Sequence, residues 1–214
     1  MTARVPPAAP ACCALLCAAA LTGCHQLAGH AANAHGKRLY ARGQVAAAAD
    51  SFRRAALEDP ADPDYRHNLA AATARLRGPG EAEALYRQTL ALNPDHQPTV
   101  HKLAGLLAET GRGAEAEAFV ADWARRRPGD PRPLVELAAV RTRLGNPAAA
   151  EHALRAALAA DPDDPAALAN LGQLLERTGR PAEARRAYAA ALRADWNQPE
   201  AAARLAALGG TTAR

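Results

Sequence analysis

Cysteine and histidine are the residues of this chain of 214 amino acids whose side chains could carry nucleophilic or metal chemistry. All four cysteines stand before residue 25, and the last of them closes the tetrapeptide Leu21-Thr22-Gly23-Cys24. A thiolate is both a nucleophile and a metal ligand, so Cys24 could be alkylated, oxidised or bound to a metal. No cysteine follows it, and the rest of the chain therefore cannot form an internal disulfide.

The segment before Cys24 has the composition of an export signal. Arg4 is the one charged residue in positions 1–23, and residues 11–21 form an uncharged run of 11 residues. That run is well short of the roughly 20 residues that cross a bilayer, and it fits the apolar core of a secretory signal. We therefore expect residues 1–23 to be a signal peptide that is removed.

The tetrapeptide resembles the lipobox of bacterial lipoproteins, in which small residues precede a cysteine that takes a diacylglycerol group. The resemblance implies lipidation of Cys24, palmitate-type acyl chains, a tether over residues 24–29 and the lipid membrane as a partner. Each buried acyl methylene contributes roughly 0.8 kcal/mol, so two or three chains would hold the protein stably. His25 stands where aspartate would signal retention in the inner membrane, so we expect an outer-membrane position facing the periplasm. The alternative is ordinary cleavage after residues 18–20, which would leave Cys24 as a thiol.

The seven histidines do not form a recognisable metal site. No two of them share the i, i+4 spacing or the cysteine partners that make a zinc site persuasive. The chain also has no glycine-rich phosphate loop, no GxSxG elbow and no cysteine after residue 24. We expect no metal, no cofactor and no enzyme activity.

The charge balance does not favour nucleic acid as a partner. The chain has 26 Lys and Arg against 22 Asp and Glu, a net charge of +4, and basic residues alternate with acidic ones. Interleaved charges are typical of a solvated helical surface, and no basic platform rich in aromatic residues accompanies them.

A repeat of 34 residues organises the chain after the leader. Prolines recur at this interval, and so do three other columns: an alanine twelve residues before each proline, a small residue at position eight of each unit, and a bulky apolar residue four positions after the alanine. The proline column is Pro60, Pro94, Pro128 and Pro162; the small column is Gly36, Ala70, Ala104, Ala138 and Gly172; the bulky column is Phe52, Tyr86, Val120, Leu154 and Tyr188. A small residue lets two helices approach closely, and a bulky residue one turn on fills the space between units.

Turn residues predict two helices in each unit. Asp62, Asp130 and Asp164 each precede a proline, which is the arrangement of an N-cap followed by the first helical position. Glycines then stand just after the first helix, where a left-handed C-terminal residue is wanted: Gly43, Gly111, Gly145 and Gly179. In the second unit Gly78 comes one place late, so we expect an irregular turn there.

These columns resemble the tetratricopeptide repeat (TPR) family, and residues 171–192, LGQLLERTGRPAEARRAYAAAL, match its pattern closely. The resemblance implies an all-α fold, a right-handed α-solenoid of five helix-turn-helix repeats at about 30–62, 63–96, 97–130, 131–164 and 165–195. Residues 196–214 are expected to form a capping helix and a disordered tail. We expect that helix over residues 198–208, with Ala202, Leu205, Ala206 and Leu208 on the face that covers the last repeat.

In the TPR family the first helices of successive units line a concave groove that binds peptides. Carried over position by position, the resemblance implies a polar groove floor that consists of Lys37, Tyr40, His67, Asn68, Arg75, His101, Lys102, Glu109, Arg132, Glu136, Arg143, Asn170, Gln173, Glu176 and Arg177. The family's clamp for a C-terminal carboxylate is not reproduced. Several arginines could still pair bidentately with carboxylates of an extended segment.

These expectations combine into a membrane-anchored scaffold of the bacterial envelope that holds one or more envelope proteins. Pilus assembly, secretion and outer-membrane assembly are all compatible with such a scaffold. The alternative function is an accessory module that presents substrates to a separate envelope enzyme such as a glycosyltransferase. Pairing of solenoid edges into homo-oligomers is a third hypothesis.

Overall fold

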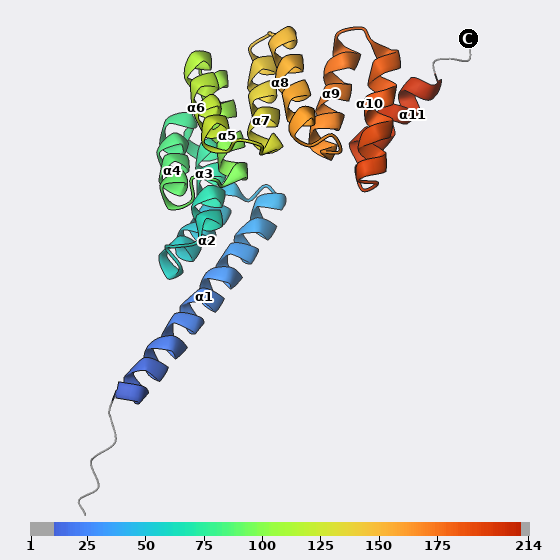
Figure 1. The fold of residues 1–214 in the computed structure, drawn as a ribbon. Helices are drawn as coiled ribbons and strands as arrows, with labels where there is room; N and C mark the ends of the chain where they lie inside the picture. The colour runs from blue at the N-terminus through green and yellow to red at the C-terminus, as the bar shows by residue number, and fades with distance from the viewer. Residues whose placement is uncertain (1–10, 211–214) are drawn as a thin grey trace, which may run out of the picture. The chain divides into compact units, whose positions relative to one another are not determined.

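The structure, a computed structural model, describes the backbone of residues 11–210 and the side chains of residues 26–209. Within that range the chain forms eleven α-helices and no strand (Figure 1). The helices are α1 (Ala11–Ala41), α2 (Val45–Glu58), α3 (Pro63–Arg77), α4 (Pro79–Leu92), α5 (Gln97–Glu109), α6 (Gly113–Arg126), α7 (Pro131–Arg143), α8 (Pro147–Ala160), α9 (Pro165–Arg177), α10 (Pro181–Ala194) and α11 (Pro199–Gly210). The predicted all-α fold is confirmed.

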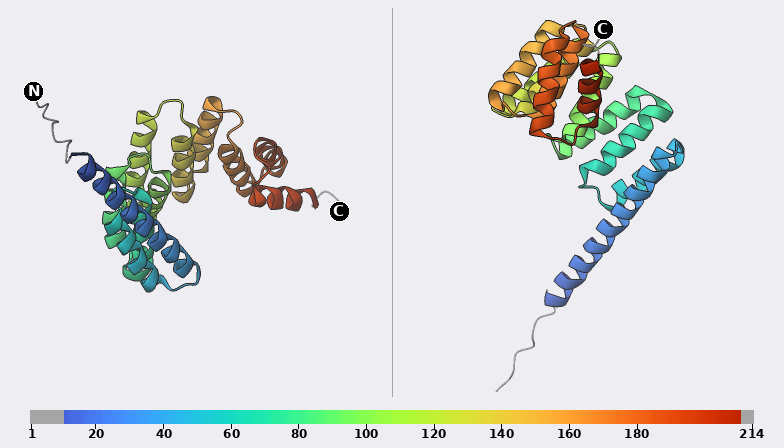
Figure 2. Two further views of the ribbon diagram at one scale, coloured as in Figure 1. Left: turned by 90° about the horizontal axis from the view of Figure 1, so that it is seen from below. Right: turned by 90° about the vertical axis from the view of Figure 1, so that its right-hand side faces the viewer.

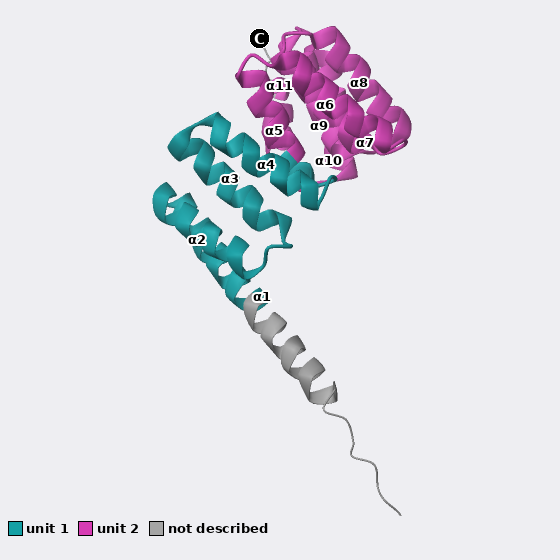
Figure 3. Cartoon of the chain, turned by 90° about the vertical axis from the view of Figure 1, so that its left-hand side faces the viewer, with its two compact units in different colours: residues 1–99 teal, residues 100–214 magenta. Residues whose placement is uncertain are grey.

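The chain divides into two compact units, with the boundary between Thr99 and Val100 inside α5 (Figure 3). In the first unit α1 pairs with α2 and α3 pairs with α4; in the second, α7 pairs with α8 and α9 with α10. Successive hairpins stack through α2 on α3 and α8 on α9, as the views in Figure 2 show within each unit. The first helices also meet directly, α1 with α3 and α7 with α9. This is the stacking of helical hairpins that characterises an α-solenoid.

The small and bulky columns pack against each other within a hairpin. A Cβ atom added to Gly172 of α9 would lie 2.7 Å from ring carbons of Tyr188 in α10, and one added to Gly36 would lie 2.6 Å from Phe52. Real Cβ atoms do not approach so closely, so glycine leaves the space that these two aromatic rings occupy. The small residue therefore lets the paired helices approach closely, as predicted, and the bulky residue covers it within the same hairpin.

Four of the five turns inside hairpins have the same hydrogen bonds. The glycine adopts a positive φ of 74 to 79°, and the N–H of the next residue donates to a carbonyl five residues back, as Arg180 does to Leu175 at 2.8 Å. This is the Schellman arrangement that ends a helix. The turn after α3 differs: Gly78, with φ 89° and ψ −178°, is the one residue between α3 and α4. The irregular turn predicted there is confirmed.

The helix α11 covers one end of the second unit. Ala201 is buried, and Leu205 and Leu208 are partly buried against a cluster that contains Leu175 and Tyr188. The sequence prediction had placed Ala202 and Ala206 on this face, but both are exposed. The contact stripe runs through Ala201, Leu205 and Leu208, so it contains the two predicted leucines but not the two predicted alanines. Residues 211–214 of the predicted tail lie outside the described residues.

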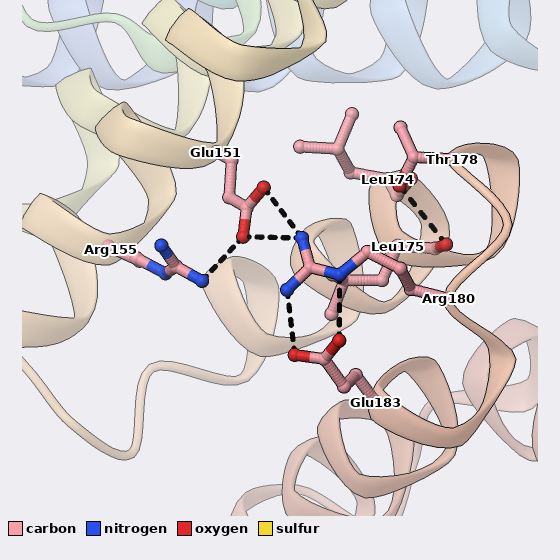
Figure 4. Close-up of polar contacts among 7 residues, drawn as sticks. All are labelled: Glu151, Arg155, Leu174, Leu175, Thr178, Arg180 and Glu183. Carbon is pink, nitrogen blue, oxygen red and sulfur yellow. Dashed lines mark hydrogen bonds and ion pairs between the residues drawn. The ribbon is translucent and has the colours of Figure 1, made fainter.

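An ion-pair network joins α8 to α10 on the outside of the second unit (Figure 4). The Arg180 guanidinium donates to Glu151 at 2.9 Å and to Glu183 at 2.7 Å, and Arg155 contacts the same Glu151 at 2.6 Å. These hydrogen bonds raise the pKa of Arg180 above its ordinary value. All four side chains are at least partly exposed, so the network contributes modestly to stability while fixing the α9–α10 turn.

The expected signal peptide and Cys24 fall at the edge of the described region. Residues 1–10 of the expected signal peptide lie outside it, as do the side chains of residues 11–25, Cys24 included. Residues 24–29, predicted as a tether, have helical backbone in α1, and Gly29 is buried against Tyr65. Among the helices that the structure describes, none is both long enough and apolar enough to cross a bilayer.

Candidate functional site

A cavity of about 250 Å³ in the second unit gathers five of the predicted groove residues. His101 comes from α5, Arg143 from α7, and Asn170, Gln173 and Arg177 from α9. Apolar and small side chains complete the lining: Ala138, Ala139, Leu154, Leu174 and Thr142. A smaller cavity of about 130 Å³ shares Thr142, Leu174 and Arg177 with it. The cavity therefore has an apolar floor and a polar, basic rim.

The two arginines on this rim are the main source of its charge. Arg143 and Arg177, one repeat apart, lie on the adjacent helices α7 and α9, and both are exposed. No carboxylate of the described residues lies within ion-pairing distance of either guanidinium. Other arginines of the described chain do form ion pairs, either within one helix, as Arg87 does with Glu83, or between helices, as Arg141 does with Glu117. The rim therefore presents donors that a carboxylate ligand could pair with bidentately.

The third basic group, His101, is held by a buried carboxylate. Its Nδ1 lies 2.8 Å from Oε2 of Glu136, whose side chain is 9% exposed, whereas that of His101 is 40% exposed. A buried carboxylate needs a hydrogen-bonded partner, and His101 supplies one. The contact fixes the imidazole ring and gives its Nδ1 a partner inside the protein, while Nε2 has no partner among the described residues.

Other predicted groove residues of the second unit have partners elsewhere. Arg132 pairs with Asp130 at 2.6 Å at the start of α7, and Glu176 accepts from the Tyr188 hydroxyl at 3.0 Å. Lys102 and Glu109 are exposed on α5 and do not line the described cavities. Sequence position alone did not separate these residues from the cavity residues, because all of them occupy groove columns.

In the first unit the predicted residues form a smaller, more apolar cavity of about 140 Å³. Lys37, Tyr40 and Asn68 line it together with Ala41, Phe52 and Ala71. The Arg75 guanidinium carbon lies 5.1 Å from the centre of the Tyr40 ring, which is cation–π distance. Below this surface, burial raises the pKa of Tyr86 to about 12, with Tyr40 adding to the effect, so the Tyr86 hydroxyl stays neutral at physiological pH.

His67, also predicted for the groove, belongs to a chain of polar contacts in which His96 and Thr99 are buried and Asp64 is exposed. Its Nδ1 lies 2.9 Å from the hydroxyl of Thr99, which is 2.7 Å from Nδ1 of His96, and Nε2 of His96 lies 2.9 Å from Asp64. A neutral His96 that donates to Asp64 accepts from Thr99, which leaves the Thr99 oxygen to accept from His67. The chain joins the start of α5 to α3.

This order of carboxylate, imidazole and hydroxyl is that of a hydrolase triad, but the burial argues against catalysis. Thr99 is 0% exposed, and its hydroxyl already contacts two imidazoles. A nucleophile must reach a substrate, and this one does not. The described residues also contain no group of three or more side chains that could hold a metal ion. The chain Asp64–His96–Thr99 therefore has a structural role.

A spacing of 35 residues could have found two of the contacts that the sequence prediction missed. Asn68 donates to Asn33 at 2.9 Å, and His101 contacts Glu136 at 2.8 Å. In both cases position five of one repeat meets position six of the next. The partners lie on the first helices of adjacent repeats. Because one is at position five and the other at position six, the spacing is one residue longer than the repeat. In the Thr99 chain the shared spacing is 32 residues, from His67 to Thr99 and from Asp64 to His96.

Comparison with known sequences gives matches over most of the chain. Residues 33–96 and 136–199 match a family model described as tetratricopeptide repeat, and residues 79–137 match a second model with the same description. No curated protein matches the chain.

Solved structures give a similar result. A thermophilic TPR protein from Thermus thermophilus is 26% identical, with a TM-score of 0.64 over 85% of this chain and 98% of that one. The pilF protein of Pseudomonas aeruginosa is 21% identical, with a TM-score of 0.58 over 87% of this chain and 91% of that one. MamA of Desulfovibrio magneticus is 18% identical, with a TM-score of 0.50 over 80% and 97%. The last two similarities bear on the fold alone.

Proposed function

The chain belongs to the tetratricopeptide repeat family, whose members generally mediate protein–protein interaction, and from this premise we propose that it is a lipid-anchored scaffold of the bacterial envelope. Its partner is an envelope protein with an extended, acidic segment, which binds in the cavity of the second unit. The lipid is attached at Cys24. The anchor part of the proposal rests on the sequence Leu21-Thr22-Gly23-Cys24.

One observation carries the binding part of the proposal, the convergence of His101, Arg143 and Arg177 on one cavity. Two arginines without a carboxylate partner among the described residues repel each other, and an acidic ligand would relieve that repulsion. The amide of Asn170 and the side-chain carbonyl of Gln173, whose side-chain N–H donates to Glu200 at 3.2 Å, can bond to the ligand's backbone, and the apolar floor accommodates an aliphatic side chain.

The binding site is tested by crosslinking and pull-down from membranes with the intact protein. We expect the variant Arg143→Glu with Arg177→Glu to lose most of the captured partner, because the rim becomes acidic. The matched control is Arg185→Glu with Arg186→Glu, which makes the same charge change on exposed residues of α10 away from the cavity. Equal capture by wild type and the cavity variant would contradict the site, and equal loss in both variants would indicate a nonspecific charge effect.

The anchor is tested separately with labelled palmitate and membrane fractionation. We expect label on the wild type and on Cys17→Ser, and none on Cys24→Ser, which should move to the soluble fraction. Cys17 lies in the segment that the proposal says is removed, so it is the matched control. An unlabelled wild type would contradict lipidation and leave the proposed binding site unaffected.

A further inference from the structure

In the second unit an arginine bridges the second helices of neighbouring hairpins at two places. The Arg141 guanidinium donates to Glu117 of α6 at 2.8 Å and to a backbone carbonyl of α8 at 3.3 Å. The Arg180 guanidinium donates to Glu151 of α8 at 2.9 Å and to Glu183 of α10 at 2.7 Å (Figure 4). Glu117 and Glu151 occupy the same position of their repeats, 34 residues apart. In both clefts an arginine and a glutamate therefore lie between two second helices.

The equivalent positions of the first unit carry short, uncharged residues. Ala49 of α2 occupies the repeat position of the two glutamates. Thr73 occupies that of Arg141, and Gly78 occupies that of Arg180. The cleft between α2 and α4 is therefore not bridged in this way.

A cavity of about 460 Å³ lies in this cleft. Both α2 and α4 pack on α3, and all three helices contribute to the lining. Its apolar wall includes Ala49, Leu69, Ala84 and Leu85. None of the predicted groove residues lines it. The volume falls in the range of roughly 300–1,000 Å³ that ligand sites have, so a long side chain can enter the cleft.

Two exposed carboxylates of the lining have one ion-pair partner each. Asp50 pairs with Arg53 in α2, and Glu81 of α4 pairs at 3.2 Å with an arginine at the end of α3. A carboxylate can take a second guanidinium, because one glutamate of the α8–α10 network contacts two arginines. Glu81 also occupies the repeat position of Glu183, which accepts from the bridging arginine of that network. The acceptors of a bridging arginine are thus present without the arginine.

Thr73 adds a hydroxyl that has no partner. Its side chain lines the cavity and is 8% exposed, yet the hydroxyl has no hydrogen-bond partner among the described residues. Thr89 and Thr142, by contrast, donate to the carbonyl four residues back. Every fully enclosed side-chain nitrogen or oxygen in the described part of the chain has a partner, so the Thr73 oxygen is accessible. It can accept a hydrogen bond from a group in the cavity.

We propose that the α2–α4 cleft binds an arginine side chain of a partner protein, which takes the place that Arg141 and Arg180 take in the clefts of the second unit. The guanidinium pairs with Glu81 and Asp50, and the Thr73 hydroxyl accepts one of its N–H groups. The aliphatic part of the side chain packs on the apolar wall. This surface requires none of the residues assigned to the cavity of the second unit.

The probe is n-propylguanidinium, which is the arginine side chain without its backbone. It is titrated at constant ionic strength into uniformly ¹⁵N-labelled residues 24–214, the chain that cleavage before Cys24 leaves, with Cys24→Ser. We expect it to shift the backbone amide signals of Ala49, Thr73 and Ala84 at concentrations up to about 20 mM, where a site with a Kd near 5 mM is mostly occupied. Propylurea, which has the same shape without the charge, and propylammonium, which has the charge without the planar fork, should shift these signals at least fivefold less.

Three protein variants complete the test. Glu81→Gln, an exposed change, should reduce the shifts at least fivefold. The matched control is Glu115→Gln, the same change at the same repeat position of α6, which is also exposed and does not line the cavity, so it should leave the shifts unchanged. Ala49→Glu with Thr73→Arg recreates the ion pair between α6 and α7 and should abolish the shifts by filling the cleft.

Four outcomes would overturn the proposal. These are no shifts at Ala49, Thr73 and Ala84, equal shifts with propylurea, equal shifts with propylammonium, and shifts that survive Glu81→Gln. An equal reduction by Glu81→Gln and Glu115→Gln would show a nonspecific response to charge and would also overturn the site. The comparison of these two exposed variants decides the matter even if the buried double variant fails to fold.

Discussion

The pair formed by Gly172 and Tyr188 shows how single residues set the distance between helices. Tyr188 is fully buried, and its ring occupies the place that a Cβ on Gly172 would need. In the fourth repeat the equivalent residues are Ala138 and Leu154. In these two repeats the smaller residue of the small column thus stands opposite the larger residue of the bulky column.

We expect Gly172→Ala to lower the free energy of unfolding by about 1–2 kcal/mol, since overpacking outweighs the higher helix propensity of alanine. Urea denaturation followed by circular dichroism measures the change. Gly80→Ala in α4 is the matched control: an added Cβ there meets no atom within 4 Å, so the protein should gain about 0.5–1 kcal/mol. The double variant Gly172→Ala with Tyr188→Leu recreates the pair of the fourth repeat and should recover part of the loss. A Gly172→Ala protein as stable as wild type would contradict the close packing.

At the level of elements, the N-cap residue of α7, Asp130, both caps the helix and forms an ion pair with Arg132. Asp130 accepts the backbone N–H of Arg132 at 3.1 Å and the Arg132 guanidinium at 2.6 Å. Hydrogen bonds from the Arg132 side chain lower the pKa of Asp130 to about 2, against the opposing effect of burial. Arg132 stood among the predicted groove residues, but a helix cap holds it at the start of α7.

This pKa makes part of the stability depend on pH. A carboxyl whose pKa is about 3.8 when unfolded and about 2 when folded stabilises the protein fully above about pH 5, and roughly half of the contribution is lost by pH 3. Asparagine caps a helix as well as aspartate does, so Asp130→Asn isolates the charge. We expect this variant to be about 1 kcal/mol less stable than wild type at pH 7, after allowance for the partly exposed Arg132.

The difference between wild type and Asp130→Asn should shrink steadily as the pH falls from 5 to 3, as measured by urea denaturation. Arg132→Gln is the control, because without its guanidinium the effect of Asp130→Asn at pH 7 should be much smaller. A difference that stays constant over this pH range would show that the ion pair contributes nothing.

At the level of the whole molecule, stability depends on contacts between neighbouring elements. Helices of 12 to 15 residues are marginal in isolation, so each is stabilised by the helices stacked on it. The helix α11 provides this cover at the C-terminal end, where Ala201 contacts the cluster that contains Leu175 and Tyr188. Loss of that cover should weaken the second unit first.

We expect Ala201→Asp, which places a charge in that contact, to reduce hydrogen-exchange protection most in α11 and α10, less in α7 and α8, and not in α2 and α3 of the first unit. Native-state exchange followed by mass spectrometry measures the gradient. The matched control is Ala202→Asp, the same change one residue on, at an exposed position that should cost no more than a few tenths of a kcal/mol. Uniform loss of protection across both units would show that the chain unfolds as one cooperative body.

The fold was predictable from the sequence because its signals are local. Asp62, Asp130 and Asp164 cap the helices that follow them, and glycine ends four of the first helices, wherever those helices lie in space. The 34-residue period then makes each hairpin face an equivalent neighbour, which determines the class of fold. The buried face of α11 was predicted less well. A small rotation of the helix about its axis changes which alanine is buried, and the surface on which the helix packs determines that rotation.

The choice among the groove residues was decided by tertiary structure alone. The repeat positions predicted five residues equally as groove residues: Arg132, Arg143, Arg177, His67 and His101. The local cap of α7 paired Arg132 with Asp130, whereas packing placed His67 against the buried Thr99 and brought His101, Arg143 and Arg177 to one cavity. A sequence period specifies which positions share a face of a helix. Whether a side chain on that face meets a partner depends on residues about one repeat away, and only the distance between stacked helices determines that contact.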